Sequence, residues 1–460
     1  MERRNFFKGL TSTVIASGIA PGLLISCNKS KQDVSESDDY SDDDHRFINK
    51  IAGMSLKDLY DKYRSDLFDE FLPFMDKYII DHQLGGFMCD ADRDGTLLDT
   101  NKRIWYQGRG VWVYSFLYNN FGKDPKHLEI ARKTVEWLEK TTPPKGKLWT
   151  PWFTKDGKPI GKEETEIYSD LHVAQGYTQY ALASGDMSYW DKAKDIWRKC
   201  VDVYNNRPGY GIDAHFYQVQ INEKKRYEGI PNPRIVGHWM DFLTLVTQML
   251  EIKEDPEIED FAALDVDSVL NKHYNPEYRL ITEYLNKDYT RINGPQGREV
   301  TGHTLETLWM ILYEAVRKKD KKTFDKAAGY LRRHIELLYD YVYEGSFQGL
   351  MDVDTYEFDM TKALWVQDEI LVGCMYVYEH TGALWAKEWY ERIYNFVQEK
   401  ALLKKHGLKL WNIYADRKMT FEPHYNRIGN YHHPRELMLN LLSIERIISN
   451  NGALSNPFIK

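Results

Sequence analysis

The residues best suited to chemistry lie in the stretch Thr301-Gly-His-Thr-Leu-Glu-Thr-Leu-Trp309. If this stretch is helical, His303, Glu306 and Trp309 share one face, because residues three or four positions apart are neighbours on a helix. An imidazole beside a carboxylate and an aromatic plate suits proton transfer on a polar, ring-shaped substrate. A second cluster, Tyr431-His-His-Pro-Arg435, opens the last predicted helix. A fold that joins the two clusters would place two imidazoles against one substrate.

His432 and Arg435 are the candidate site residues of the second cluster. Pro434 favours a helix entry at this point. A helix N-terminus disfavours a cationic imidazole, so we expect a neutral histidine that can act as a base near neutral pH. Zinc binding is the alternative, since His303 and Glu306 with a distant histidine supply ligand types. The sequence has no His-Glu-x-x-His and no Cys/His cluster, so we expect no metal.

Arg109 stands among aromatic residues in Trp105-Tyr-Gln-Gly-Arg-Gly-Val-Trp112. A buried guanidinium needs hydrogen-bond partners, so Arg109 is either a donor clamp on substrate oxygens or a structural residue paired with a core carboxylate. Trp105 is a candidate stacking surface for a sugar ring.

Two further helix starts carry polar groups. His238 precedes Asp241 by three residues, which suits either a carboxylate-oriented ring or an ordinary core histidine. Lys362 is followed by Trp365 and Glu369, which share a face at i and i+4. We interpret His238, Asp241, Lys362 and Trp365 as candidate substrate contacts and Glu369 as a candidate catalytic carboxylate. For Trp365 and Glu369, the alternative is an aromatic core residue and a buried structural carboxylate.

The apolar pattern is helical throughout, with a period near 3.6 residues. It predicts about twelve helices, at 56–79, 105–121, 126–142, 166–184, 188–205, 234–252, 257–273, 299–317, 322–344, 361–381, 384–399 and 433–449. An apolar, aromatic helix alternates with a charged, amphipathic one. Buried and surface helices in alternation, six times over, predict an all-α (α/α)6 toroid whose inner helices start near one mouth. Short β-hairpins are expected in the longer loops at 80–104, 206–233, 274–298 and 400–431, which line that mouth.

The composition excludes some functions. The formal net charge is −8, which argues against nucleic acid as a partner. The four cysteines are far apart and show neither a metal knuckle nor a disulfide framework. Aromatic residues make up 14% of the chain, with 13 Trp and 32 Tyr. Such side chains stack on sugars but also build cores, and a surface rich in them is compatible with a homodimer.

The first residues are typical of an export signal. Glu2-Arg-Arg-Asn-Phe-Phe-Lys8 resembles a twin-arginine signal, and an interrupted apolar stretch follows it. Leu24-Ile-Ser-Cys27 resembles a bacterial lipobox with Cys27 as the lipidated residue; a plain cleaved signal is the alternative. We therefore expect a signal at 1–26, a lipidated tether at 27–55 and a catalytic domain at 56–460. The protein would be an exported lipoprotein, periplasmic or outer-membrane associated, that meets the membrane only through its anchor.

In the motifs around Trp105, His303, Lys362 and Tyr431, the chain resembles the N-acylglucosamine 2-epimerase family, which includes cellobiose 2-epimerases and aldose–ketose isomerases. The likeness covers residues from about 56 to 449. It rests on the Gly-Gly-Phe hairpin with its Asp-Arg-Asp-Gly turn, on the Trp105 and His303 motifs, on Lys362 to Glu369, and on Tyr431-His-His-Pro-Arg435.

The resemblance implies roles for these residues. His303 and His432 correspond to the two acid/base histidines, Arg109 to the active-site arginine, and Glu306 and Glu369 to supporting carboxylates. Glu306 would orient His303. His238 resembles a third histidine of the cellobiose and isomerase branches, which is followed there by Glu where this chain has Asp241. Thr301 and His433 also depart from the common pattern.

The resemblance implies a sugar 2-epimerase that needs no cofactor and interconverts N-acylglucosamine and N-acylmannosamine or a related free reducing sugar. One histidine would remove the C2 proton and the other would return it. An aldose–ketose isomerase acting on mannose-like sugars is the first alternative. A glycoside hydrolase using Glu306, Glu369 or Asp241, or a sugar-binding lipoprotein, is the alternative from another class.

Overall fold

The computed structural model describes residues 47–458 apart from 93, 212–219, 222–223, 226–229, 402–412 and 415–428. Contacts divide the chain into Met1–Asp43 and a compact unit, Asp44–Lys460, and the described residues all belong to the second of these. The predicted signal and the lipidation of Cys27 lie outside the described residues. None of the helices in the described part combines the length and the apolar character that a membrane crossing requires.

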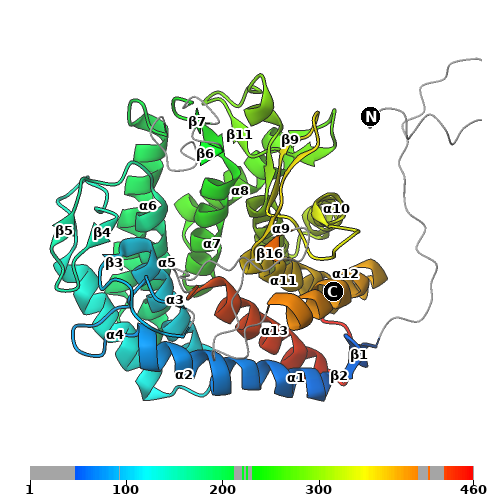
Figure 1. The fold of residues 1–460 in the computed structure, drawn as a ribbon, viewed down its shortest axis with the longest axis horizontal. Helices are drawn as coiled ribbons and strands as arrows, with labels where there is room; N and C mark the ends of the chain where they lie inside the picture. The colour runs from blue at the N-terminus through cyan, green and yellow to red at the C-terminus, as the bar shows by residue number, and fades with distance from the viewer. Residues whose placement is uncertain are drawn as a thin grey trace, which may run out of the picture. The chain divides into compact units, whose positions relative to one another are not determined.

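Six helices of the unit are buried on most faces and follow one another around a ring. They are α3 Ile104–Asn120, α5 Tyr168–Ser184, α7 Val236–Ile252, α9 Gly302–Lys318, α11 Leu364–Thr381 and α13 His432–Ser449. Each packs on the next along the chain, and α13 returns to contact α3. Figure 1 shows α5, α7, α11 and α13 at the centre of this unit. These helices have little exposed surface, and their polar side chains, such as Glu306 and Arg435, are largely buried with them.

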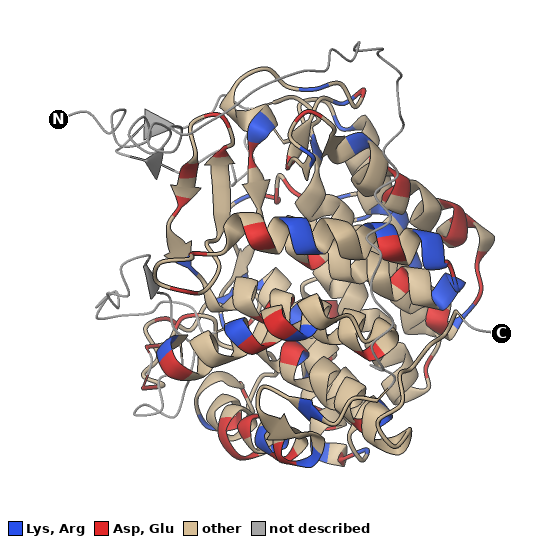
Figure 2. Cartoon of the chain, turned by 90° about the vertical axis from the view of Figure 1, so that its right-hand side faces the viewer, with Lys and Arg blue, Asp and Glu red and all other residues tan. Residues whose placement is uncertain are grey.

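The outer helices each pack against a preceding inner one. They are α4 Pro125–Lys140, α6 Ser188–Asn206, α8 Pro256–Asp267, α10 Lys321–Leu338 and α12 Leu384–Phe396. The sixth outer position is filled by the helical segment α1 Leu56–Ser65, η2 Asp66–Phe71, α2 Leu72–Phe74 and η3 Met75–Ile79, whose α1 packs on α13. Acidic and basic residues are interspersed along helices of this unit (Figure 2). The expected (α/α)6 toroid is therefore confirmed.

Inner and outer helices start differently. Asp124, Asp255 and Asp320 cap α4, α8 and α10 with their side chains, which satisfies free backbone N–H groups. By contrast, α3, α7, α9 and α11 are each entered from a two-residue strand: β3 Lys102–Arg103, β8 Arg234–Ile235, β12 Val300–Thr301 and β15 Thr361–Lys362. The strands hold the first turns of the inner helices at one end of the ring, where the candidate residues lie.

Small antiparallel sheets account for the remaining strands, and one of them, β1–β2, lies near the C-terminal end of α13. Besides the four entry strands, they comprise β1 Lys50–Ile51, β2 Met54–Ser55, β4 Trp152–Phe153, β5 Pro159–Ile160, β6 Gln220–Ile221, β7 Lys224–Lys225, β9 Tyr274–Asn275, β10 Leu280–Ile281, β11 Tyr284–Leu285, β13 Gly349–Asp352, β14 Glu357–Asp359 and β16 Ile413–Tyr414. They pair as β1–β2, β3–β4–β5, β6–β7, β8–β11, β9–β10, β12–β13–β14 and β15–β16. Short helical turns at η5 Ser268–His273, η6 Pro295–Arg298 and η7 Val397–Ala401 complete the connections.

The predicted helix boundaries need three corrections. The helix expected at 322–344 ends at Leu338, because Tyr339 is extended and bridges Ser346. The helices expected from 299 and 361 begin three residues later, since the preceding residues form β12 and β15. The unit also includes residues before 56: Phe47 bridges Ala453, so the chain joins the fold ahead of the first helix.

Candidate active site

His303 stands in the first turn of α9, where the side chain of Thr301 caps the helix. Its Nδ1 lies 3.1 Å from Oε1 of Glu283, a buried residue just before β11. Glu283 also accepts from the N–H of Gly237 at 3.1 Å and from the Thr301 hydroxyl at 2.6 Å. Burial opposes ionisation of Glu283, but His303 and these donors outweigh it and lower its pKa.

The same contact shifts the pKa of His303. Burial lowers the pKa of its imidazole, but the Glu283 carboxylate outweighs burial and raises the pKa above its usual value. The pKa of His303 is therefore raised although the residue stands at a helix N-terminus, because a carboxylate at hydrogen-bond distance acts more strongly than the helix dipole.

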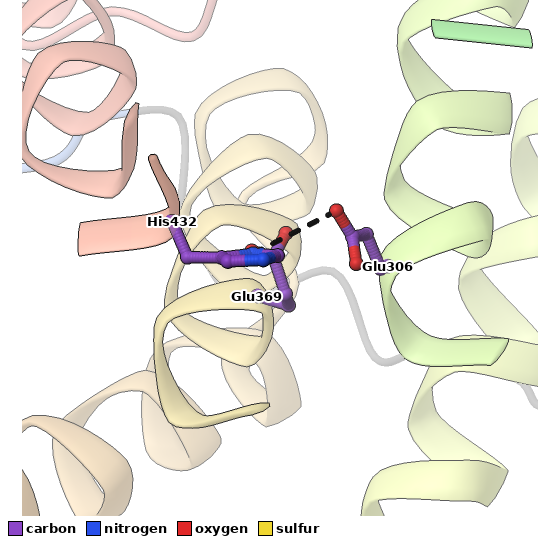
Figure 3. Close-up of side chains that lie close together, drawn as sticks. All are labelled: Glu306, Glu369 and His432. Carbon is purple, nitrogen blue, oxygen red and sulfur yellow. Dashed lines mark hydrogen bonds and ion pairs between the residues drawn. The ribbon is translucent and has the colours of Figure 1, made fainter. Parts of the chain in front are cut away.

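Glu306 does not orient His303, contrary to expectation. It is buried and accepts a short hydrogen bond from Nη2 of Arg435, which also donates to Oε1 of Glu369 at 2.7 Å. Glu306 on α9, Glu369 on α11 and His432 on α13 lie close together (Figure 3), and Nη2 of the Arg435 guanidinium contacts all three side chains. Arg435, 1% exposed, neutralises two buried carboxylates, which is a supporting role, and its assignment as a substrate contact stays a prediction.

His432 forms a second histidine–carboxylate pair. Its Nδ1 lies 2.7 Å from Oε1 of Glu369, whose other oxygen accepts from the Trp309 indole at 2.7 Å. Burial raises the pKa of Glu369, while Arg435 opposes that shift. Because the carboxylate takes the Nδ1–H of His432, Nε2 is the nitrogen left for proton transfer. Trp309 is 6% exposed and holds Glu369 in place, so it is not the expected stacking surface.

Trp365 lies between the two imidazoles. Its ring centroid is 5.7 Å from that of His303 and 5.5 Å from that of His432, and it is partly exposed. Gly302 makes this packing possible, since a Cβ there would lie 2.6 Å from the Trp365 ring. Both histidines therefore border the same indole, as the two-imidazole hypothesis requires.

Arg109 faces the same end of the ring from α3. Its guanidinium lies 4.5 Å from the ring centroid of Trp105 and 4.9 Å from that of Tyr431, and its Nε donates to Nε2 of His172 at 3.1 Å. Arg109 and Trp105 are both partly exposed. The guanidinium is thus held by two aromatic faces and one imidazole, consistent with a preorganised donor.

His238 and Asp241 are buried more deeply. His238 is fully buried among tyrosines, with Nε2 3.4 Å from the Tyr210 hydroxyl, and burial lowers its pKa to about 3. Asp241 is 2% exposed and accepts from Gln175 at 3.4 Å. Burial raises the pKa of Asp241 to about 7, against the opposing effect of Arg109. Of the two interpretations, the ordinary core histidine fits these contacts better, because His238 packs among tyrosines and its Nε2 faces Tyr210.

Lys362 is a structural residue, and the prediction of a substrate contact is wrong. Its ammonium donates to Asp340 at 2.7 Å and to the Glu344 carbonyl at 2.5 Å, and the side chain is fully buried. Lys102 makes the same contacts with Asp81 and the Gly85 carbonyl in the first hairpin. Both lysines tie a hairpin to the start of an inner helix, which fixes the tryptophan three residues later.

Sequence reasoning missed Glu283 and His172. Glu283 comes from a loop and leaves no periodic signal. The spacing between successive inner helices could have identified His172. Arg109 and His172 are 63 residues apart in sequence and in contact, as are Glu369 and His432. The 62 residues from Asp241 to His303 complete a threefold pattern of a polar residue on one inner helix and a histidine on the next.

Two groups of side chains have metal-ligand composition. Glu306, Glu369 and His432 bring ligand atoms within 4.8 Å of one another, as do Asp368, His433 and Glu436. In the first group the Arg435 guanidinium already serves both carboxylates, so a cation there would be repelled by it. In the second group His433 turns to Asp368, with Nδ1 and Oδ1 3.2 Å apart, and so lies behind the site.

Comparison with known proteins identifies the family of this chain. A family model described as N-acylglucosamine 2-epimerase matches residues 85–433. The N-acylglucosamine 2-epimerase of Rattus norvegicus is 29% identical over 276 residues, which cover 58% of this chain and 60% of that protein. The chain thus matches about three fifths of the length of this relative.

Two cellobiose 2-epimerases are matched over more of their length. That of Ruminococcus albus is 22% identical over 376 residues, covering 78% of this chain and 91% of the relative. The solved structure of the enzyme from Spirochaeta thermophila DSM 6192 has a TM-score of 0.69 at 16% identity and covers 85% of this chain and 98% of that one. The family model spans most of the chain, and this chain is a member of the N-acylglucosamine 2-epimerase family.

Proposed function

We propose that this protein is a sugar 2-epimerase that acts on an N-acylhexosamine or a related free reducing sugar. One observation carries the proposal: His303 and His432 are each held at Nδ1 by a carboxylate, and both border Trp365. Family membership supports it, since relatives named N-acylglucosamine 2-epimerase and cellobiose 2-epimerase match the chain.

The chemistry is proton exchange next to a carbonyl. After the sugar ring opens, one neutral imidazole removes the C2 proton and leaves an enediolate. The other histidine, as an imidazolium, returns a proton to the opposite face of C2, so one proton is taken and one is given. Glu283 raises the pKa of His303, and Glu369 holds His432 by the same kind of contact, so either imidazole can carry the proton that is delivered to C2. The epimer that is bound decides which histidine acts as the acid. In the reverse direction the roles exchange.

Arg109 supplies the positive charge that the enediolate needs. A weak carbon acid reacts only if the developing oxyanion meets a donor already in position. Arg109 is fixed by two aromatic rings and His172 before substrate arrives. Removing such a donor typically costs about a hundred- to thousandfold in rate.

Aldose–ketose isomerisation uses the same residues and differs only in the carbon that receives the proton. If the imidazolium delivers its proton to C1 instead of C2, the product is a ketose. The two reactions are therefore separated by the product and not by the arrangement of the histidines.

Glycoside hydrolysis is disfavoured by the positions of the carboxylates. A hydrolase needs two carboxyl groups roughly 5 to 9.5 Å apart on either side of the scissile bond. Glu306 and Glu369 both accept from the same nitrogen of Arg435, and their nearest oxygens lie within 4.8 Å of each other. With Arg435 between them they cannot flank a sugar linkage.

Proton NMR in deuterium oxide tests the proposal. The mature protein is incubated with N-acetylglucosamine, N-acetylmannosamine, mannose, glucose and cellobiose. Deuterium entering C2 together with a new epimer supports an epimerase, and a ketose product would make it an isomerase. No exchange with any free sugar would reject both, and oligosaccharide cleavage would then be assayed.

We further propose that the chain is exported and anchored through Cys27. The support is the arginine pair, the apolar stretch and the lipobox-like Leu24-Ile-Ser-Cys27. A Cys27→Ala variant should appear in the soluble fraction, and unchanged membrane retention would reject the anchor.

A homodimer stays a prediction that light scattering of the mature protein checks.

A further inference from the structure

His172 occupies a place at the active end that the proposed mechanism does not use. It lies in the second turn of α5, is 2% exposed, and its Nε2 receives the Nε–H of Arg109 at 3.1 Å. Its Nδ1 lies 3.2 Å from Oε1 of Gln175. An arginine can only donate, so Nε2 must be the acceptor and Nδ1 must carry the proton, which it gives to Gln175.

The residues around Arg109 are linked to one another by hydrogen bonds and ring contacts. The Tyr431 hydroxyl donates at 3.1 Å to the same Gln175 oxygen that receives His172 Nδ1–H. The Tyr431 ring in turn covers the Arg109 guanidinium, whose centre lies 4.9 Å from the ring centroid. His172, Gln175 and Tyr431 thus hold each other and the arginine.

The relation between Arg109 and His172 repeats that between Glu369 and His432. Each pair joins an inner helix to the next one, at hydrogen-bond distance and 63 residues apart. The partner decides what the imidazole can do. A carboxylate makes the histidine a donor and favours its charged form, whereas a guanidinium requires a neutral acceptor. Asp241 Oδ2 also lies 3.6 Å from His172 Nε2, beyond hydrogen-bond distance, so the closer Arg109 contact decides the role. Position 172 therefore suits holding a cation and not exchanging a proton.

We infer that His172 is a positioning residue for Arg109. By taking the single Nε–H, it sets the rotation of the guanidinium in its aromatic slot. This contact uses neither of the two terminal amino groups, which are the part of arginine suited to grip an oxyanion. The inference rests on the proposed function, because it assigns His172 to the step in which Arg109 stabilises the enediolate.

Two variants of His172 test this role by kinetics. His172→Leu removes the acceptor, and His172→Gln retains an oxygen that can receive the Nε–H. We expect His172→Leu to lower kcat roughly ten- to hundredfold, the scale of a misplaced catalytic group, with KM changed by less than about threefold. His172→Gln should recover most of kcat. His334→Leu is the matched control, since His334 is equally buried and hydrogen-bonded but lies on the outer helix α10.

A double-mutant cycle with Arg109→Gln separates positioning from general damage. If His172 acts through Arg109, His172→Leu should cost less than about twofold once Arg109 is absent. The same fractional loss in both backgrounds, or wild-type kcat in His172→Leu, would overturn the inference. If His172→Leu does not fold, the cycle is run with Gln175→Leu, which removes the acceptor of His172 Nδ1–H.

A spectroscopic arm does not depend on turnover. In protein labelled with ¹⁵N-arginine, the Arg109 Nε–H should give a resonance protected from water exchange, which disappears in His172→Leu and persists in His334→Leu. An unprotected resonance in the wild type would refute the contact. Absence of sugar turnover in the wild type would instead reject the proposed function, so the two failures are distinguishable.

Discussion

Replacing Glu283 by glutamine should change the acidity of His303 while preserving its position. The amide is isosteric with the carboxylate and can still accept from Gly237 N–H and from His303 Nδ1–H. At the 3.1 Å separation of the His303 and Glu283 atoms, the lost charge interaction is at most about 5 kcal/mol for an effective dielectric constant of about 20. A partner carboxylate typically shifts a pKa by about 1–3 units, equivalent to about 1.4–4 kcal/mol.

The direction follows from the raised pKa of His303. If His303 is the acid, activity falls on the alkaline side as its imidazolium loses the proton. Without Glu283, this limb of kcat/KM should move to lower pH by about 1–3 units. At a pH one unit below the wild-type pKa, the protonated fraction would then fall by about twofold for a one-unit shift and by about a hundredfold for a three-unit shift.

The assay is C2 deuterium exchange between pH 5 and 9, with thermal melting as the check on folding. Glu314→Gln is the matched control, because Glu314 is a buried carboxylate on the same helix that binds Arg317 and Thr247 away from the site. An alkaline limb that does not move in Glu283→Gln would refute the claim that this carboxylate sets the charge of His303.

Three further predictions concern the surroundings of the site. Lys362→Met leaves Asp340 buried without its partner and should lower the free energy of unfolding by about 3–5 kcal/mol in urea titrations. The control Lys321→Met, at an exposed pair, should cost less than about 1 kcal/mol. A stable Lys362→Met variant with a raised KM would restore the substrate role of Lys362. Burial raises the pKa of Asp241 from its usual 3.8 to about 7, so the folded state favours the protonated form of this residue. The resulting stability is present below about pH 4 and is lost as pH rises through about 7. In that window, the melting temperature of Asp241→Asn should depend less on pH than that of the wild type. Dialysis against EDTA should leave C2 exchange unchanged, because Arg435 already neutralises Glu306 and Glu369; activity that is lost and then restored by a divalent cation would contradict this.

The sequence predicted the helices well because their burial leaves a strong pattern. The inner helices are apolar on most faces and the outer ones carry a charged face, and this alternation identified the ring. The boundaries failed at 299, 322–344 and 361, where two-residue strands or an extended turn adjoin a helix. Such strands depend on pairing with distant segments, which local periodicity does not report.

The sequence predicted which residues form the site better than it predicted which of them contact one another. His303, His432, Arg109, Trp365 and Glu369 do gather at one end of the ring. Partners were assigned wrongly where a neighbour in sequence seemed sufficient. Glu306 lies one turn from His303 yet binds Arg435, while the partner of His303 comes from 20 residues upstream. Tertiary contacts of this kind cannot be read from helical spacing.

The most direct test of the two-histidine account is isotope exchange in His303→Asn and His432→Asn, each assayed separately with the two epimers of a substrate in deuterium oxide. If each histidine serves one face of C2, both variants should lose interconversion, and each should still exchange the C2 proton of one epimer, a different one in each variant. Exchange of the same epimer in both variants, or interconversion that survives either substitution, would contradict the account.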